Sequence, residues 1–397
     1  MRGKYFAGPF GGRLTPCPFC AYLLKEQVDN MPSPFVHRDG TSFNLNSGAF
    51  PVFGVNCYFL AYCAESSCRA AMNTAQQWGA NTIRTWAFAD AAQPGNGVAF
   101  QYLENGVIKI DDGPNGLQRL DVVIQTADQL GLKLILPLVN HWKDFGGMPM
   151  YLQWLGLDPA NVNQFYESLD ARLVYRNWLQ HVLTRRNTLT GRLYCDEPSI
   201  MAWELTNEAR CDGSRDILLD WVHEMAGFVK QLDPNHLVAL GDEGFFNEQH
   251  FYRHSNKGQL YDGRHGTDFA AILDIPEIDF GGYHFYPQDW DHANDLEFGS
   301  QWITDHAAAG NRAGKPVLME EYGLKIGNPA VPDSATRNDW FTRWLQTVQD
   351  TKTAGSLLWM LGCAEADTVG YKDDYVVYKS DEVPALLTYA KATASTP

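Results

Sequence analysis

The sequence predicts an α/β fold in which eight parallel strands, each followed by a helix, close into a barrel. Short β-rich runs alternate with amphipathic helical runs in eight rounds from Val52 to the C-terminus, as expected of parallel strands joined by crossover helices. The chain has 397 residues, of which 45% are hydrophobic, whereas about 250 residues suffice for a typical barrel of this kind. These observations favour one enlarged (β/α)8 TIM barrel.

The barrel strands are expected at the β-rich runs, with boundary errors of a few residues. In chain order they are Val52–Asn56, Thr82–Trp86, Leu132–Val139, Ile200–Leu205, Leu237–Gly241, Ile278–His284, Pro316–Glu321 and Ser356–Met360. The helices between them are expected where apolar residues recur with helical periodicity. These segments are Ser67–Trp78, Leu117–Leu130, Ala171–Arg186, Ile217–Leu232, Trp302–Ala309, Trp340–Thr351 and Val383–Lys391.

The first fifty residues do not follow this alternation. Their Gly, Pro and aromatic content predicts an irregular lead-in over residues 1–50, with a hairpin around Arg38-Asp39-Gly40 that could close the bottom of the barrel. Residues 51–397 then form the barrel domain. Long loops in this fold build the functional site, and they are expected at Ala87–Asn115, Asn140–Leu169, Asp242–Ala270 and Leu361–Asp381.

The composition narrows the class of partner. The chain has 31 Lys plus Arg against 47 Asp plus Glu, a net charge of −16, which opposes binding to nucleic acid or to anionic membranes. No apolar run approaches the ~20 residues of a membrane span. Aromatic residues make up 13% of the chain and include 12 Trp, and such rings stack well on the apolar faces of sugars.

The eight cysteines do not predict a metal site. Cys17 and Cys20 form a lone pair without a second Cys or His pair at zinc spacing. A local disulfide there, or between Cys63 and Cys68, is an alternative if the protein is exported. Cys195 and Cys211 lie at opposite ends of a predicted strand and should not bond to each other.

Two predicted strands that lie far apart in the sequence end in carboxylates. The strand at Ile200 leads into Asn207-Glu208, and the strand at Pro316 ends in Glu320-Glu321. Because the carboxyl ends of barrel strands open on one face, these groups can meet across a pocket. A pair of carboxylates across a pocket is the machinery of glycoside hydrolysis.

At these motifs the chain resembles glycoside hydrolase family five, and the string from Trp203 to Cys211 is similar to that of its β-mannanase branch. The resemblance implies a retaining mechanism in which Glu208 is the acid/base, with a raised pKa. The nucleophile of the family precedes an aromatic residue and often a Gly. Glu321, followed by Tyr322 and Gly323, is therefore preferred to Glu320, which strand alternation would turn towards the helix layer.

The resemblance also implies residues that bind the sugar or support the carboxylates. Arg84 should keep the nucleophile ionised, His284 should support the acid/base, and Tyr286 should hydrogen-bond the nucleophile. The full set is Arg84, Trp86, Asn140, His141, Trp142, Asn207, Arg210, Glu243, His284, Tyr286 and Trp359. The chain departs from the family pattern at three positions, with His141 in place of Asn, Asp242 in place of Glu and Ala209 in place of Pro.

The expected function is a retaining β-mannan hydrolase, an endo-β-1,4-mannanase that uses no metal and no cofactor. An exo-acting β-mannosidase or a β-1,4-glucanase would use the same carboxylates, and a non-catalytic carbohydrate-binding barrel is the remoter alternative. The expected partner is mannan or a manno-oligosaccharide, and the protein is expected to be a monomer. The resemblance implies a secreted or extracytoplasmic protein, although Gly and Pro interrupt the segment after Arg2 and Lys4, so that no signal peptide is clear.

Overall fold

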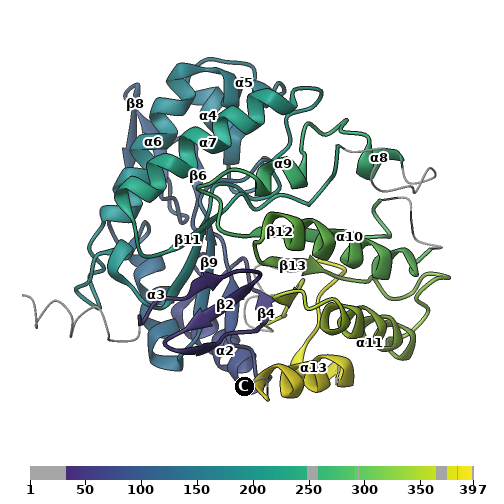
Figure 1. Ribbon diagram of the computed structural model, residues 1–397. Coiled ribbons are helices and arrows are strands. Elements are labelled where there is room, and N and C mark those ends of the chain that lie inside the picture. Colours follow the sequence, from purple (N-terminus) through teal and green to yellow (C-terminus); the bar gives the residue numbers. More distant parts are fainter. Residues whose placement is uncertain are drawn as a thin grey trace, which may run out of the picture.

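The computed structural model describes residues 33–247, 258–290, 292, 295–363, 373–381 and 383–395. Its main sheet has eight parallel strands, in the order β11-β10-β9-β5-β4-β14-β13-β12, that curve into a barrel (Figure 1). The strands are β4 (Val52–Asn56), β5 (Thr82–Arg84), β9 (Lys133–Pro137), β10 (Ile200–Glu204), β11 (Leu237–Ala239), β12 (Gly281–Phe285), β13 (Val317–Tyr322) and β14 (Gly355–Leu358). Each overlaps one of the eight predicted strands, and the predicted fold class is confirmed.

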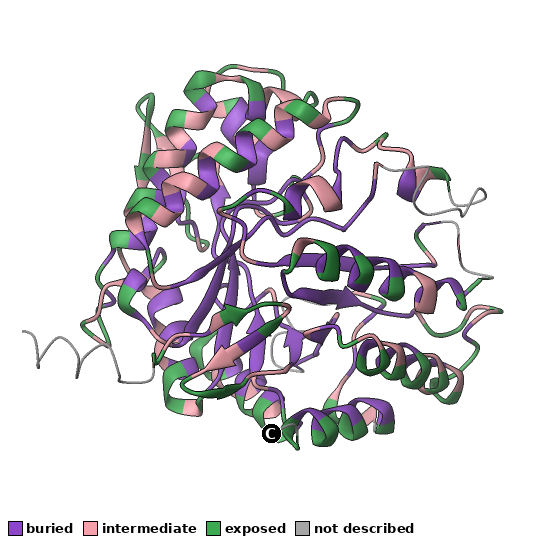
Figure 2. Ribbon diagram, in the orientation of Figure 1, coloured by how far each residue is buried: buried purple, intermediate pink, exposed green. Residues whose placement is uncertain are grey.

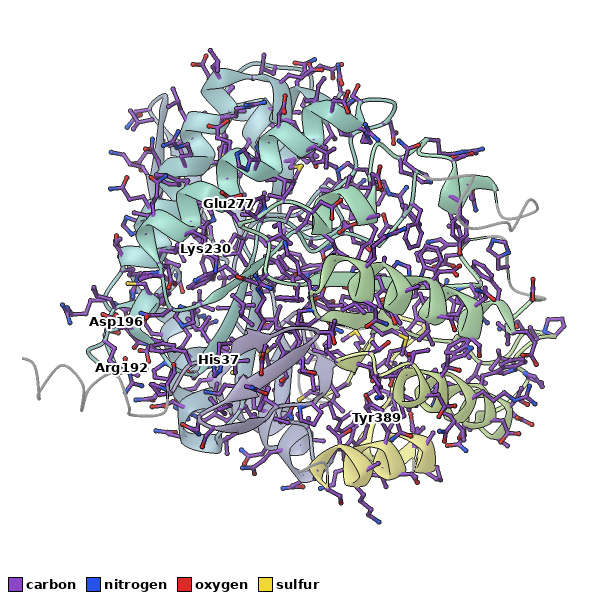
Figure 3. The ribbon with its side chains drawn as sticks, viewed as in Figure 1. His37, Arg192, Asp196, Lys230, Glu277 and Tyr389 are labelled. Atoms are coloured by element: carbon purple, nitrogen blue, oxygen red, sulfur yellow. The ribbon has the colours of Figure 1, made fainter. Side chains whose placement is uncertain are left out.

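Strands β11 and β12 are the two ends of the hydrogen-bonded strand order. The seam between them is closed by other contacts in place of a strand ladder. The Asp279 amide donates to the Val238 carbonyl over 2.8 Å, and the Val238 amide donates back to the Asp279 carboxylate over 2.8 Å. Lys230, labelled on the outer helix layer in Figure 3, forms an ion pair with the same carboxylate. A side chain and a few loop contacts thus replace a strand ladder at this seam.

Helices surround the barrel with their apolar faces turned inward, so that in Figure 2 the strands and inner helix faces are buried while the outer faces are exposed. Those at predicted positions are α2 (Glu65–Gln77), α3 (Gln118–Leu130), α6 (Leu169–Thr184), α7 (Arg215–Leu232), α10 (Phe298–Ala313), α11 (Ser334–Asp350) and α13 (Pro384–Ala394). The long loops hold further short elements, namely β6 (Asp90–Ala91), β7 (Gln101–Glu104), β8 (Val107–Ile110), α4 (Gly147–Trp154), α5 (Asn163–Glu167), α8 (Gly258–Tyr261), α9 (Phe269–Leu273) and the 3-10 turns at Tyr194–Asp196 and Lys379–Asp381.

A small antiparallel sheet covers the end of the barrel where the strands begin. It consists of β1 (His37–Asp39), β2 (Ser42–Leu45) and β3 (Gly48–Ala49), and its first turn passes through Gly40 at a φ of 58°. The expected hairpin therefore forms. The Phe43 ring meets Phe280 edge-on, with centroids 5.4 Å apart, and both belong to the apolar cluster that fills the lower barrel.

The six cysteines in the described part of the chain are free thiols, so the alternative of a bond between Cys63 and Cys68 is wrong for this structure. The two groups face different partners, because Cys63 Sγ contacts the Leu60 carbonyl and Cys68 Sγ contacts the sulfur of Met72. Cys17 and Cys20 lie outside the described residues. None of the helices in the described part of the chain has the length and apolarity needed to span a bilayer.

Candidate active site

Long loops and strand ends enclose a cavity of about 320 Å³ at the carboxyl end of the barrel. Its walls combine carboxylates, the groups that carry glycoside hydrolysis, with aromatic rings that can stack on the apolar faces of sugars. The lining residues are Trp86, Asn140, Trp142, Asp144, Asn207, Glu208, Glu243, Tyr286, Asp289, Trp290, Glu321, Trp359, Asp373 and Tyr375. Both predicted catalytic carboxylates are therefore in one cavity.

Glu208 enters this cavity from the loop after β10. Its backbone has a φ of 54°, a left-handed conformation that is uncommon outside glycine and that concentrates at functional sites. One carboxylate oxygen accepts a hydrogen bond from Trp142 Nε1 over 2.6 Å, and the other lies 2.9 Å from His284 Nδ1. The side chain is 17% exposed, so it is held firmly while still reaching the cavity.

Glu321 approaches from β13 and is held by three groups. One oxygen accepts a hydrogen bond from Arg84, and the other accepts one from the Tyr286 hydroxyl over 2.6 Å. His284 Nδ1 lies 3.5 Å from that second oxygen, so the imidazole stands between Glu321 and Glu208. The expected partners of the nucleophile are thus brought together.

Glu320 does not face the helix layer, which corrects the expectation from strand alternation. The ladder pairs Tyr283 with Met319 and then His284 with Glu321, so Glu320 is an extra residue, a β-bulge. A bulge interrupts the alternation of side chains and re-aims them. A Cβ atom on Gly282 of the neighbouring strand would lie 1.9 Å from a Glu320 carboxylate oxygen, and the side chain is fully buried.

The pKa values of the carboxylates differ from the expectation for an acid/base. Burial raises the pKa of Glu208, but its hydrogen bond to His284 and the charge of that ring prevail and lower it to about 2. The pKa of Glu321 is raised by burial, against the opposing charges of His284 and Arg84. Burial lowers the pKa of His284, but Glu321 and Glu208 together raise it. These directions favour a proton on His284 over one on Glu208, whose pKa is lowered and not raised as expected.

Aromatic rings form one wall of the cavity. Trp359 stacks on Tyr58 with centroids 5.7 Å apart and an interplanar angle of 11°, and Trp86 lies 4.7 Å from the same ring. Trp359 Nε1 donates to Asp373 over 2.6 Å, while the buried Trp86 Nε1 has no partner among the described residues. An apolar platform of this kind is suited to a sugar ring.

Two asparagines hold the loops that carry Trp142 and Glu208. The Asn207 amide donates to the Asn140 side-chain oxygen over 3.1 Å, and the Asn207 oxygen accepts from Arg84 over 2.8 Å. The Asn140 side chain in turn donates to the Asp144 carbonyl. These contacts tie the ends of β9 and β10 together, so the geometry of Glu208 depends on both asparagines.

Arg210 and Glu243 form a bidentate ion pair with both N–O distances at 2.6 Å. The guanidinium lies 5.1 Å from the centroid of the Trp142 ring. Burial and the charge of Glu208 raise the pKa of Glu243 to about 7, although Arg210 opposes them. Glu243 lines the catalytic cavity, whereas Arg210 is not among its lining residues and is 21% exposed.

His141 takes a different position from the rest of the predicted set. It lines an adjoining hollow of about 800 Å³, which it shares with Trp142, Lys143 and Asp212, among others. Burial and the charge of Arg210 lower its pKa to about 4, so the ring is neutral. Trp142 and Asp144 belong to both hollows and connect them.

Several site residues were not predicted from the sequence. The loops after β12 and β14 contribute Asp289, Trp290, Asp373 and Tyr375, and the loop after β4 contributes Tyr58. Strand periodicity ends before each of these loops, so no pattern placed their side chains. The aromatic content of the loops was the one available signal.

Glu208, His284 and Glu321 are also a group that the described residues offer to a metal ion, with ligand atoms within 4.8 Å of one another. Arg84, however, places its positive charge directly on Glu321, which opposes a cation there. His284 Nδ1 is already engaged with Glu208. The arrangement is better suited to holding and transferring a proton.

Comparison with known proteins agrees with this geometry. Residues 33–364 match a family model described as GH family 5 beta-mannosidase-like. The chain is 35% identical over 364 residues to mannan endo-1,4-beta-mannosidase F of Aspergillus fumigatus, covering 90% of this chain and 77% of that protein. It is 35% identical over 351 residues to mannan endo-1,4-beta-mannosidase A of Hypocrea jecorina, covering 87% and 74%.

Solved structures give the same result. An endo-1,4-beta-mannanase from Rhizomucor miehei superposes with a TM-score of 0.82 at 34% identity, covering 91% of this chain and 99% of that one. An endo-beta-1,4-mannanase from Thermotoga petrophila superposes with a TM-score of 0.76 at 34% identity, covering 87% and 77%. The chain belongs to glycoside hydrolase family 5, among its β-mannosidase-like members.

Proposed function

We propose that the protein is a retaining endo-β-1,4-mannanase in which Glu208 is the acid/base and Glu321 is the nucleophile. The observation that carries this proposal is the short separation of the two groups, whose facing oxygens lie within 4.8 Å. Carboxyl groups of retaining glycosidases are about 5 to 5.5 Å apart, whereas inverting enzymes need about 6.5 to 9.5 Å to admit a water molecule.

Glu321 would attack the anomeric carbon while the glycosidic bond breaks, which leaves a covalent glycosyl-enzyme. Arg84 and Tyr286 each occupy one oxygen of this carboxylate. These contacts favour the ionised form, because charged and neutral donors both stabilise a carboxylate. They also fix its orientation, so that a lone pair can face the sugar without reorganisation.

Glu208 would protonate the leaving oxygen and later remove a proton from the attacking water. The proton available in the free site belongs to the hydrogen-bonded Glu208–His284 pair. Because His284 Nδ1 lies 2.9 Å from Glu208, the proton can cross this hydrogen bond when a substrate fills the cavity. Trp142 holds the other oxygen, which fixes the orientation of the carboxylate.

The substrate assignment rests on the named relatives and on the cavity walls. The relatives and the superposed structures are named as mannan endo-1,4-beta-mannosidases and endo-mannanases. Trp86 and Trp359 would stack on the sugar at the cleavage point, while Asn140, Asn207 and Glu243 would contact its hydroxyl groups. Trp142, Arg210 and His141 would contact the leaving-group side, where Trp142 joins the two hollows.

We further propose that the protein acts as a monomer outside the cytoplasm. All the described residues that line the catalytic cavity belong to one chain, which supports a monomer as the active form. A polymeric mannan reaches only an enzyme on the outer side of the membrane. Sedimentation at micromolar concentration and assay of cell-free medium would test these two points.

Hydrolysis of mannohexaose and cellohexaose tests the proposed function. The specificity constant kcat/KM should be higher for mannohexaose, and proton NMR at early times should show β-anomeric products, as retention requires. A ladder of short oligomers indicates endo action, whereas release of mannose alone indicates an exo-mannosidase. Equal or better cleavage of cellohexaose would contradict the mannan assignment and leave the two-carboxylate mechanism standing.

A further inference from the structure

Two carboxyl groups that take no direct part in the mechanism lie beneath the nucleophile. Glu204 is the last residue of β10, and Glu320 is the bulged residue of β13. Both are completely buried. Buried carboxyl groups are costly unless their charges are neutralised or paired, so this pair requires a physical reason for being there.

Two glycines, Gly282 in β12 and Gly241 just after β11, leave space for these side chains because they lack a Cβ atom. A Cβ on Gly282 would lie 1.9 Å from a Glu320 oxygen, and one on Gly241 would lie 2.7 Å from a Glu204 oxygen. Both distances are far below van der Waals contact. The interior of the barrel is therefore shaped to hold both carboxyl groups at this level.

Arg84 is the cation that faces them. Its Nε donates to Glu204 over 2.9 Å, its Nη1 donates to Glu321, and Glu320 lies close enough to interact with its charge. Three carboxyl groups thus share one guanidinium. If all three were ionised, the group would carry two uncompensated negative charges in a fully buried place.

Protonation of one of the two deeper carboxyl groups reduces this excess of negative charge. The side chains of Glu204 and Glu320 face each other, and Glu204 Oε1 and both Glu320 oxygens are buried without a hydrogen-bond partner among the described residues. Ionised carboxylates only accept hydrogen bonds, so the two side chains can bond to each other only with a proton on one of them. Glu204 already accepts from Arg84, whereas neither Glu320 oxygen has a donor among the described residues. The proton therefore belongs on Glu320.

We propose that Glu320 is a positioning residue that remains protonated during turnover and donates its proton to Glu204, which in turn holds Arg84 against the nucleophile. This inference rests on the proposed function, because it takes Glu321 as the nucleophile. The groups that face Glu320 are Glu204 from β10, Arg84 from β5 and Glu321 from its own strand. Burial and the charge of Glu204 raise the pKa of Glu320 well above its usual range, although Arg84 opposes them.

Replacement of Glu by Gln should have unequal effects on turnover at Glu320 and at Glu204. Glu320→Gln replaces the carboxylic acid by an amide that still donates to Glu204, so kcat/KM should remain within about threefold of wild type and the acidic limb of its pH profile should not move. Glu204→Gln removes the charge that positions Arg84. It should lower kcat by at least about tenfold with little change in KM, and should shift the acidic limb.

Infrared difference spectroscopy provides a readout that does not depend on activity. In D2O at neutral pH, wild type minus Glu320→Gln should show the C=O band of a protonated carboxyl group. Glu197→Gln is the matched control, since Glu197 is equally buried but accepts from Arg192 and should give a carboxylate band. The proposal is overturned by any one of three results: a carboxylate band for Glu320, a shifted acidic limb of the pH profile in Glu320→Gln, or failure of that variant to fold.

The proposed function fails separately if wild type does not cleave mannohexaose or if Glu321→Ala remains active. The infrared result still decides where the proton resides in that case.

Discussion

The two ends of the barrel interior are built from opposite chemistry. At the lower end, Val36 and Phe43 from the covering sheet pack with apolar strand residues such as Phe280. At the upper end, Arg84 lies among Glu204, Glu320 and Glu321, and all four are buried. The same eight strands therefore carry a continuous apolar core at one end and a cluster of charged groups at the other.

This difference indicates that the lower end of the barrel interior contributes mainly to stability and the upper end mainly to reactivity. Burial of apolar surface stabilises the fold by about 25 cal/mol per Å², whereas buried ion pairs often contribute little net stability because desolvation offsets their attraction. We therefore expect substitutions at the upper end to change turnover far more than stability. Substitutions at the lower end should do the reverse.

The largest effect is expected from Glu321→Ala, which removes the proposed nucleophile. Turnover of manno-oligosaccharides should fall by at least about 10⁴-fold, while the melting temperature should stay near that of wild type because an unfavourable buried carboxylate is removed. Steady-state kinetics and calorimetry measure the two quantities. Glu104→Ala, at an exposed position in β7, is the control. Near-native turnover of Glu321→Ala would remove it from the mechanism.

Glu208→Ala should have the next largest effect and should depend on the leaving group. Loss of general acid catalysis costs about 10² to 10⁴-fold, but an activated aryl mannoside needs little protonation and should suffer less. Azide should restore turnover of the aryl substrate, since Glu321 still forms the glycosyl-enzyme. The absence of both rescue and leaving-group dependence would show that Glu208 has another role.

Phe43→Ala tests the lower end. Removal of this buried ring should cost about 3 to 5 kcal/mol of unfolding free energy, with kcat unchanged, because the ring packs on Phe280 far from the carboxylates. Urea denaturation measures the loss, and Phe43→Leu should recover much of it. A large fall in kcat in a folded Phe43→Ala protein would mean that the two ends are coupled.

Arg210→Ala tests whether the charged end extends to substrate recognition. The variant loses the bidentate pair with Glu243 and the contact with Trp142. Long manno-oligosaccharides should be used about tenfold to hundredfold less well, while an activated aryl mannoside should be nearly unaffected. An equal loss on both substrates would assign Arg210 to the catalytic carboxylates instead.

The smallest expected effect is on the pH dependence of stability. Burial raises the pKa of Asp90 to about 8 and that of Asp242 to about 7. The unfolded chain has already released these protons near pH 4, so the folded state binds more protons than the unfolded state. Stability should therefore fall as the pH rises from about 6.5 to 8. Urea denaturation at these two values measures the fall, which Asp90→Asn should reduce and Phe43→Leu should leave unchanged.

The sequence predicted those parts of the molecule that periodicity and chain order control. Eight strands were predicted because each is a β-rich run followed by a helical pattern, and strand ends then placed Glu208 and Glu321 on one face. Glu320 was misplaced because a β-bulge leaves no mark in a period-two pattern. The pKa of Glu208 was misjudged because it depends on a distance to His284, 76 residues further along the chain.

The seam between β11 and β12 gives the barrel the connectivity of an open ribbon. The uninterrupted ladder begins at β11, passes through β4 and β14 and ends at β12, so the first and last barrel strands in chain order, β4 and β14, are neighbours inside the sheet. Linking the chain beyond β14 to the start of β4, and cutting it near Asp274, would yield a circular permutant whose sequence order follows the ladder. Such a permutant would lose no strand pairing, because the cut lies between the two strands that share none.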